Sequence, residues 1–168
     1  MTADGVMRAA VVTVSDRAAS GEREDASGPA LRAALEAGDW EVISAEIVPD
    51  EATELVAVLR RLADEARVPL VLTTGGTGLG PRDITPEATR LVLDREAPGL
   101  AEEARRVSRE KTPFAVLSRG VAGTRGSSLI VNLPGSPRAV VEVFAALAPV
   151  LPHAVRVLVE DTKEHPSP

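Results

Sequence analysis

Short apolar segments of high β propensity alternate with segments of helical periodicity along most of the chain. A polar or glycine-containing loop and then a helix follow each strand-like segment, so consecutive strands are joined through helices. Strands connected in this way form a parallel sheet with helices packed on both faces. The sequence therefore predicts an α/β fold, a three-layer sandwich with a mostly parallel sheet. The expected strands are residues 8–14, 40–48, 69–73 and 128–133.

The 168 residues are predicted to form a single domain, 1–168, because dividing them would leave two cores too small to be stable. Residues 1–7 and 161–168 are expected to be flexible ends. A last amphipathic helix is expected to end near Val159. Residues 114–117 are expected to form a short strand or the approach to one.

Composition excludes several classes of chemistry. The chain has no cysteine, which excludes disulfides and thiol nucleophiles, and its two histidines cannot build a multi-histidine metal site. A net charge of −6 and the scarcity of aromatic side chains disfavour nucleic acid as a partner. No segment resembles a signal peptide or a membrane span, so we expect a cytoplasmic protein with no membrane partner. Chemistry must then come from carboxylates, hydroxyls, arginines, backbone amides or a bound hard cation.

Polar residues follow each of the four predicted strands. Ser15 and Asp16 follow the first, Asp50 follows the second, a glycine-rich loop follows the third, and Pro134-Gly-Ser-Pro137 follows the fourth. The carboxyl ends of parallel strands meet at one edge of a sheet, where ligands bind in folds of this class. We therefore expect these residues to share one site.

The glycine-rich loop lies within residues 73–80 and includes Gly75, Gly76, Thr77 and Gly78. Glycines permit left-handed backbone dihedrals, so successive N–H groups can point toward one anion. The loop is not a Walker A motif, and Pro81 breaks the dinucleotide fingerprint. Considered alone, the loop is equally consistent with phosphate binding and with an ordinary turn between strand and helix.

Asp50 and Asp83 are the candidate catalytic residues and metal ligands. Two carboxylates from separate strand ends, facing a phosphate loop, suit Mg²⁺, which takes few protein oxygens and completes its shell with substrate phosphates. Asp16 is either a third ligand or an ordinary loop acid. Two alternatives are local: Asp50 caps the following helix, or Asp83 pairs with Arg82 on the surface. The cap of the helix after Asp83 is expected to be Thr85.

Ser136 and Pro137 are typical of the start of a helix, with Gly135 just before them. Ordinary capping explains both residues. The N-terminus of a helix also binds anions, because its first N–H groups have no partner within the helix. A phosphate contact at this position is therefore the second interpretation.

The chain resembles the molybdopterin adenylyltransferases, a family that includes the Mog and MoaB proteins and the N-terminal domain of gephyrin. The match is collinear from Val11 to Pro137, and its most specific part is the Gly-Gly-Thr-Gly loop followed by Arg-Asp-x-Thr-Pro-Glu. The matching segments are Thr13-Val-Ser-Asp16, Asp25-Ala-Ser-Gly28, Val48-Pro-Asp-Glu51, Leu72-Thr-Thr-Gly-Gly-Thr-Gly78, Arg82-Asp-Ile-Thr-Pro-Glu87, Leu117-Ser-Arg119 and Asn132-Leu-Pro-Gly-Ser-Pro137.

The resemblance implies a MoaB/Mog-like molybdopterin-binding fold and a role in molybdenum cofactor biosynthesis. It implies an enzyme that uses Mg²⁺ to transfer AMP from ATP to the terminal phosphate of molybdopterin, with release of pyrophosphate. It also implies a homotrimer or hexamer, and the molybdate-inserting enzyme as a partner.

The same resemblance assigns roles to residues. Asp50 and Asp83 correspond to the catalytic and Mg²⁺-linked acids, and Ser118 and Arg119 lie toward the pterin. The residues that correspond to nucleotide and phosphate contacts are Ser15, Asp16, Gly75, Gly76, Thr77, Gly78, Pro134, Gly135, Ser136 and Pro137.

Rival functions belong to other classes. A catalytically silent MoaB-type protein would bind molybdopterin or a partner enzyme as a carrier, but the presence of Asp50 and Asp83 argues against it. A competence-damage type domain would hydrolyse pyrophosphate bonds in nucleotides, but such domains and the related domain of the molybdate-inserting enzyme carry a different sequence after Thr-Gly-Gly. A purely structural domain would leave four polar loops at one edge unexplained.

Overall fold

The structure, a computed structural model, describes residues 6–164 and, for 161–164, only the backbone. One six-stranded sheet runs through the molecule in the order β2-β1-β3-β6-β5-β4. The first four strands in this order are parallel, and β5 and β4 are antiparallel to their neighbours. The strands are β1 (Met7–Val14), β2 (Trp40–Val48), β3 (Leu70–Thr74), β4 (Arg95–Glu96), β5 (Ala122–Arg125) and β6 (Ser128–Leu133).

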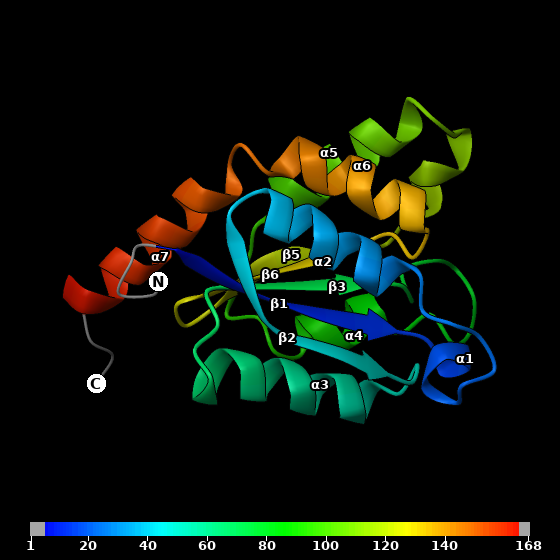
Figure 1. Ribbon diagram of the computed structural model, residues 1–168, viewed down its shortest axis with the longest axis horizontal. Coiled ribbons are helices and arrows are strands. Elements are labelled where there is room, and N and C mark those ends of the chain that lie inside the picture. The colour runs from blue at the N-terminus through cyan, green and yellow to red at the C-terminus, as the bar shows by residue number, and fades with distance from the viewer. Residues whose placement is uncertain (1–5, 165–168) are drawn as a thin grey trace.

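Helices cover both faces of the sheet, which confirms the predicted three-layer α/β sandwich with a mostly parallel sheet (Figure 1). The helices are α1 (Asp16–Ala19), α2 (Ser27–Ala37), α3 (Ala52–Arg60), α4 (Thr85–Arg90), α5 (Pro98–Arg109), α6 (Pro137–Leu147) and α7 (Leu151–Glu164). A π-helical turn, η1 (Arg61–Glu65), continues α3, and a 3₁₀ turn, η2 (Pro113–Leu117), follows α5.

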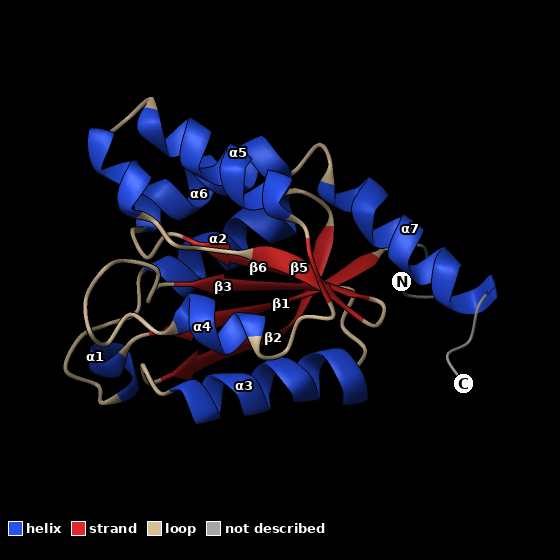
Figure 2. Cartoon of the chain, turned by 180° about the vertical axis from the view of Figure 1, so that it is seen from behind, coloured by secondary structure: helices blue, strands red, loops and turns tan. Residues whose placement is uncertain are grey.

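The sheet separates two hydrophobic cores. In one core, alternate side chains of β1, β3 and β6 pack against α2, α5, α6 and α7. In the other, the intervening side chains of the same strands pack against α3 and α4. Figure 2 shows α3 and α4 together on one side of the sheet and α2, α5 and α6 on the other. Central parallel strands are buried on both faces, which explains why they are nearly continuous apolar runs in the sequence.

The four parallel strands end at the same edge of the sheet. Val14 of β1 is level with Val48 of β2, Thr13 is level with Thr74 of β3, and Thr74 is level with Leu133 of β6. The loops that follow these strands therefore leave the sheet side by side, as the sequence pattern predicts.

The region between α5 and β6 differs from the prediction. Residues 114–117 form the turn η2 instead of a strand, because Pro113 fixes the backbone of its first residue and the Thr112 hydroxyl accepts a hydrogen bond from the N–H of Phe114. Phe114 is 75% exposed, so it has no sheet against which to pack. The short strands β4 and β5 carry too few residues for a periodic signal, and β5 contains Gly123, a residue of low strand propensity.

Both ends of the described chain also differ from the prediction. The predicted flexible ends, 1–7 and 161–168, overlap the first residue of β1 and the last turn of α7. Residues 1–5 and 165–168 lie outside the described residues. The last helix is longer than predicted, since α7 continues past Val159 to Glu164.

Within the described residues, no helix by itself has the length and apolar character needed to cross a bilayer. The helices α6 and α7 meet those criteria only when they are joined, and their axes are bent by 62° at the break between them.

Asn132 is a buried polar residue that ties together three parts of the fold. Its amide nitrogen donates hydrogen bonds to Thr73 Oγ1 at 2.9 Å and Thr89 Oγ1 at 3.0 Å, and its Oδ1 accepts one from the N–H of Val121 at 3.1 Å. The residue is only 3% exposed, so water cannot replace these partners. Asn132 therefore connects β6 to β3, α4 and the segment before β5.

We expect Asn132→Leu to lower the free energy of unfolding by about 3 kcal/mol, because a buried N–H and two hydroxyls lose their partner and the bulkier leucine has to fit the same buried site. Urea denaturation measures this change. Ile130→Val on the same strand is the control and should cost only about 1 kcal/mol, the usual effect of removing one buried methylene. A loss of stability for Asn132→Leu no larger than that of the control would contradict this account.

Candidate active site

A cavity of about 250 Å³ opens at the edge where the parallel strands end. Its wall comes from the ends of β1 and β3, the loops that follow β2 and β3, the segment before α2 and the start of α6. The lining residues are Thr13, Val14, Ser15, Ala18, Arg23, Glu24, Asp25, Ala26, Ser27, Asp50, Thr74, Gly75, Gly76, Asp83, Gly135 and Pro137. Seven of these were predicted as site residues: Ser15, Asp50, Gly75, Gly76, Asp83, Gly135 and Pro137.

Two glycines of the loop after β3 adopt backbone conformations that other residues rarely take. Gly75 has φ +99° and Gly76 has φ +62°. A methyl group on Gly75 would lie 2.4 Å from the carbonyl oxygen of Val14, and one on Gly76 would lie 2.3 Å from Thr85 Oγ1. Both the left-handed dihedrals and the close packing therefore require glycine.

Thr85 holds this loop closed and does not cap α4. Its hydroxyl donates a hydrogen bond to the carbonyl of Gly75 at 2.9 Å, and its N–H donates one to the carbonyl of Gly76 at 3.1 Å. The residue before α4 is Ile84, which makes no side-chain cap. The prediction that Thr85 is a local cap was wrong because a threonine oxygen beside a folded-back loop finds a carbonyl partner ten residues away.

Asp16 and Asp50 bind each other's backbone across the ends of β1 and β2. The N–H of Asp16 donates to Asp50 Oδ2 at 2.8 Å, and the N–H of Asp50 donates to Asp16 Oδ1 at 2.9 Å. Asp50 is therefore not the cap of α3; the residue before that helix is Glu51, whose side chain makes no capping bond. The reciprocal pair fixes the Asp50 carboxylate on the cavity wall.

Arg82 pairs with Asp16 and Glu51, and in the described residues no arginine is paired with the carboxylate of Asp83. Two of its nitrogens donate to the Asp16 carboxylate at 3.0 Å each, and the second of these also donates to Glu51 at 2.7 Å. The predicted surface pair of Arg82 with Asp83 was wrong, because β1 and β2 place two other acids within reach of the guanidinium. Asp16 is thereby committed to this pair and is not among the cavity-lining residues.

The two linked acids differ in their pKa. Hydrogen bonding from Arg82, reinforced by the Asp50 N–H, lowers the pKa of Asp16. Partial burial is the main reason that the pKa of Asp50 is raised, and the negative charges of Asp16 and Asp83 raise it further, against the Asp16 N–H that stabilises the carboxylate. Asp50 thus carries a charge that its surroundings leave partly uncompensated.

Asp83 closes a short turn of its own. Its Oδ2 accepts a hydrogen bond from the N–H of Gly80 at 2.8 Å, and its N–H donates to the carbonyl of Gly80 at 3.0 Å. Both Gly78 and Gly80 approach this carboxylate closely, because a methyl group on either would lie within 3.0 Å of Asp83 Oδ2. The turn holds one carboxylate oxygen at the glycine-rich loop.

Asp25 is a site residue that sequence reasoning did not single out. Its Oδ2 accepts a hydrogen bond from the Thr13 hydroxyl at 2.6 Å, and its Oδ1 accepts bonds from the N–H groups of Ser27 and Gly28 at 3.0 Å each. Asp25 thus accepts hydrogen bonds from the first N–H groups of α2, and it also lines the cavity. The sequence signal that could have identified Asp25 is an aspartate two residues before a helix, a position typical of a capping residue. Arg23, also on the wall, had no such signal.

The start of α6 is as predicted. Ser136 is the N-cap, and its hydroxyl accepts a hydrogen bond from the N–H of Ala139 at 3.4 Å. Pro137 occupies the first turn, and Gly135 packs so closely on Gly75 that a methyl group on it would lie 3.0 Å from the Gly75 Cα. The start of this helix and the glycine-rich loop therefore meet.

The remaining predicted residues do not line this cavity. Thr77 is buried. The carbonyl of Pro134 accepts a hydrogen bond from the Thr74 hydroxyl at 2.8 Å. Ser118 and Pro134 line a second cavity of about 200 Å³, beneath η2 and beside α5. Asp16, Thr77, Gly78, Ser118, Arg119, Pro134 and Ser136 are the predicted residues outside the first wall.

The carboxylates present fit a divalent cation that also binds the substrate. Among the residues whose side chains are described, no group of three or more His, Cys, Asp or Glu side chains could hold a metal ion. Asp50 and Asp83 nevertheless face one cavity and repel each other electrostatically. Mg²⁺ is commonly held by one or two carboxylates together with substrate phosphates, and this donor set matches that pattern.

In metal-free buffer at pH 7 we expect Asp50→Asn to melt at a temperature equal to or above that of the unmodified protein. The amide oxygen can still accept the Asp16 N–H, and the partly uncompensated charge is removed. Because the pKa of Asp50 is raised on folding, its ionisation destabilises the fold above that pKa; the difference should shrink as the pH falls and vanish below the unfolded value of 3.8.

Asp16→Asn is the matched comparison and should behave in the opposite way. Its pKa is lowered on folding, so its ionisation stabilises the fold above pH 3.8, and that contribution is lost as the pH falls through the folded pKa. Thermal melting of both variants between pH 3 and pH 8 tests the pair. A lower melting temperature for Asp50→Asn at pH 7 would contradict the electrostatic account.

Comparison with known proteins identifies relatives over most of the chain. Residues 10–153 match the family described as a probable molybdopterin binding domain. Molybdopterin adenylyltransferase of Haemophilus influenzae is 46% identical over 141 residues, which cover 83% of this chain and 72% of that protein. The molybdenum cofactor synthesis protein cinnamon of Drosophila melanogaster is 43% identical over 90% of this chain, which spans only 25% of the length of that protein.

A solved structure agrees with this assignment. The molybdopterin biosynthesis enzyme MoaB of Thermus thermophilus superposes with a TM-score of 0.87 at 53% sequence identity, covering 92% of this chain and 97% of that one. Residues 10–153, which match the family, include every strand end that lines the cavity. The chain therefore belongs to the probable molybdopterin-binding domain family.

Proposed function

We propose that this protein is a molybdopterin adenylyltransferase of molybdenum cofactor biosynthesis, acting in the cytoplasm. The observation that carries the proposal is the single cavity that Asp50 and Asp83 share with Gly75, Gly76 and the start of α6. Two acids, a turn with left-handed glycines and the start of a helix suit a nucleoside triphosphate with its cation. Relatives named molybdopterin adenylyltransferase support the choice of reaction.

In this proposal the phosphates of ATP lie against the glycine-rich loop and the start of α6. The first N–H groups of α6 and the turn at Gly75 and Gly76 orient them. Asp50 and Asp83 would hold Mg²⁺, which supplies charge neutralisation at the phosphates. The reciprocal bonds to Asp16 hold Asp50 in place, and the turn to Gly80 holds Asp83.

The reaction needs little acid or base catalysis. An oxygen of the terminal phosphate of molybdopterin attacks the α-phosphorus of ATP; that P–O bond forms while the bond from the α-phosphorus to the bridging oxygen breaks, and pyrophosphate leaves. The attacking phosphate is already anionic, so no proton has to be removed from it. The chain's contribution is then positioning and electrostatic stabilisation, which agrees with the absence of cysteine and histidine from the cavity wall.

Positive charge at the site is limited. Arg82 is paired with Asp16 and Glu51, so it does not face the cavity as a free cation. Of the side chains known to line the cavity, Arg23 is the cationic one, opposed by Glu24, Asp25 and the two catalytic acids. This balance supports a requirement for a divalent cation with two polyanionic substrates.

The pterin is proposed to occupy the second cavity, which Ser118 and Pro134 line together with Phe114 and side chains of α5. That cavity shares Pro134 with the segment that leads into α6. A structure with bound ATP and molybdopterin tests both placements. Nucleotide bound at the opposite edge of the sheet would refute the proposal.

Asp83→Asn tests the catalytic role directly. The amide oxygen can keep the bond from the Gly80 N–H, so we expect stability to change by less than about 1 kcal/mol. The adenylylation rate should fall on the order of a hundredfold, equivalent to about 3 kcal/mol of lost transition-state stabilisation. The measurements are adenylyl-molybdopterin formation from ATP and thermal melting.

Asp94→Asn is the matched control for that variant. Asp94 Oδ2 accepts the N–H of Gly126 at 2.7 Å, so it makes the same kind of bond as Asp83 but at the far end of β5. The adenylylation rate of Asp94→Asn should equal that of the unmodified protein. Near-normal turnover by folded Asp83→Asn would remove the catalytic role, and molybdopterin binding without any turnover by the unmodified protein would favour the silent carrier.

We further propose that the protein assembles as a homotrimer or hexamer, with the molybdate-inserting enzyme as a partner. Exposed apolar side chains on η2, Phe114 and Val116 among them, are consistent with an assembly. Sedimentation velocity at micromolar concentration should give at least three times the 17.6 kDa of one chain. A stable monomer would contradict the assembly without affecting the catalytic proposal.

A further inference from the structure

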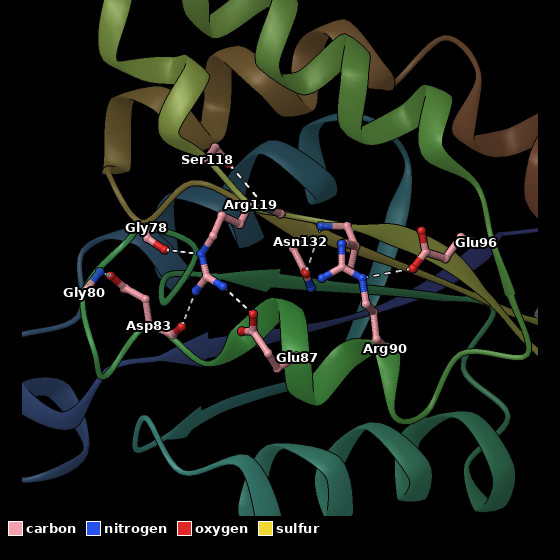
Figure 3. Close-up of polar contacts among 11 residues, drawn as sticks. Gly78, Gly80, Asp83, Glu87, Arg90, Glu96, Ser118, Arg119 and Asn132 are labelled. Carbon is pink, nitrogen blue, oxygen red and sulfur yellow. Dashed lines mark hydrogen bonds and ion pairs between the residues drawn. The ribbon is translucent and has the colours of Figure 1, made fainter.

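Arg119 reaches from the segment between η2 and β5 to the glycine-rich loop (Figure 3). Its Nε donates a hydrogen bond to the carbonyl of Gly78 at 2.6 Å, and its Nη2 donates one to the carbonyl of Asp83 at 2.5 Å. Its Nη1 pairs with Glu87 on α4, and its backbone N–H donates to the carbonyl of Thr77 at 2.9 Å. One residue thus holds three carbonyls on both sides of the Gly80 turn.

The contacts depend on the shape of a guanidinium group. Gly78 and Asp83 are five residues apart, and their carbonyls converge on two different nitrogens of the same plane. Arginine presents several N–H donors in a fixed fork, whereas the ammonium of lysine is a compact point charge on a flexible stem. A lysine could bind one of these carbonyls but could not bridge both in the same geometry.

The bridge helps to fix where the Asp83 carboxylate lies. The turn from Gly80 to Asp83 is closed internally by two bonds, one through the backbone and one through the carboxylate. Those bonds hold the turn's own shape but do not attach it to the rest of the protein. Arg82, within the turn, binds Asp16 and Glu51, and Arg119 attaches both flanks of the turn to the segment before β5. The two arginines together hold Asp83 in place relative to Asp50.

The segment that carries Arg119 is itself anchored. Arg105 of α5 donates from Nη1 to the carbonyl of Gly120 at 2.9 Å, and the N–H of Val121 is bound to the buried Asn132. Arg119 therefore connects the Asp83 turn to α5 and to the core strand β6.

The contacts of the Arg119 side chain are with the loop and with Glu87. Arg119 is absent from the residues that line the nucleotide cavity, its side chain is 32% exposed, and Glu87 balances its charge. The prediction that Arg119 lies toward the pterin stays a prediction, and the contacts described here give the residue a second role, which is to hold the loop.

We infer that Arg119 is a positioning residue that sets the Asp83 carboxylate and the glycine-rich loop in the geometry for nucleotide binding and transfer. This inference rests on the proposed function for its kinetic consequence. Its structural consequence, a turn that loosens when the guanidinium is lost, is independent of the reaction.

The test compares Arg119→Lys with Arg125→Lys in the full chain. Arg125 is a matched control, because its guanidinium also binds one carbonyl, that of Val92, and one carboxylate, that of Asp64, but it lies at the opposite end of β5 and β6. Two measurements are made: amide hydrogen exchange at Gly80 and Asp83 by NMR without ligand, and adenylylation kinetics as a function of Mg²⁺ and ATP concentration.

For Arg119→Lys we expect the amide exchange rates of Gly80 and Asp83 to rise on the order of tenfold above those of the unmodified protein, beyond any change in the rate of global unfolding. We expect kcat to fall about tenfold or more, and the half-saturating Mg²⁺ concentration to rise. Arg125→Lys should lower the melting temperature without either change. A merely structural role of Arg119 would lower the melting temperature and leave exchange at Gly80 and the Mg²⁺ dependence like those of the control, which would overturn the inference.

The remaining outcomes are also decisive. If the unmodified protein does not adenylylate molybdopterin but Arg119→Lys still accelerates exchange at Gly80, the proposed function fails and the positioning of the turn stands. If Arg119→Lys does not fold, Arg119→Gln, which keeps a donor for one carbonyl, replaces it. Failure of both variants to fold would make Arg119 a structural residue and refute its specific role.

Discussion

Parallel pairing of β2, β1, β3 and β6 is the constraint on which the site depends. It places four strand ends at one edge in register, so that the loops after them leave the sheet together. Space between those loops is scarce, and the chain after β3 passes so close to the end of β1 that Gly75 has no room for a side chain. The left-handed glycines are therefore required by packing at this edge.

Acidic groups dominate the cavity because the nearby arginines are used within the protein. Arg82 binds Asp16 and Glu51, and Arg119 binds Glu87 and two loop carbonyls, so neither offers a free charge to a ligand. Burial is the main cause of the raised pKa of Asp50, and the negative charges of Asp16 and Asp83 raise it further, in line with this imbalance. A site with uncompensated carboxylates is poorly suited to polyanions alone and well suited to a polyanion that arrives with a divalent cation. The charge distribution and the proposed reaction are therefore consistent.

Several arginine side chains in the described residues pair with carboxylates, and three arginines bind backbone carbonyls of irregular segments. Arg105 does this for Gly120, Arg119 for Gly78 and Asp83, and Arg125 for Val92. Each of these carbonyls belongs to a segment outside regular helix or strand hydrogen bonding, where an unpaired polar group is costly to bury. The loop after β3 thus combines bonds of its own, such as those between Gly80 and Asp83, with bonds from an arginine on another segment.

Local signals in the sequence were sufficient for the four parallel strands and the helices between them, the polar loops at the strand ends and the cap of α6 by Ser136, since apolar runs, glycines, prolines and capping residues act over a few positions. They were not sufficient for β4 and β5, which are too short for a periodic signal. The partners of the polar side chains were decided only by tertiary structure. Asp50 binds the N–H of Asp16 and does not cap α3, Thr85 binds the loop at Gly75 and does not cap α4, and Arg82 reaches Asp16 across 66 positions. These bonds exist because strand order and register bring distant residues together, and no local propensity specifies which carbonyl or carboxylate will then be nearest.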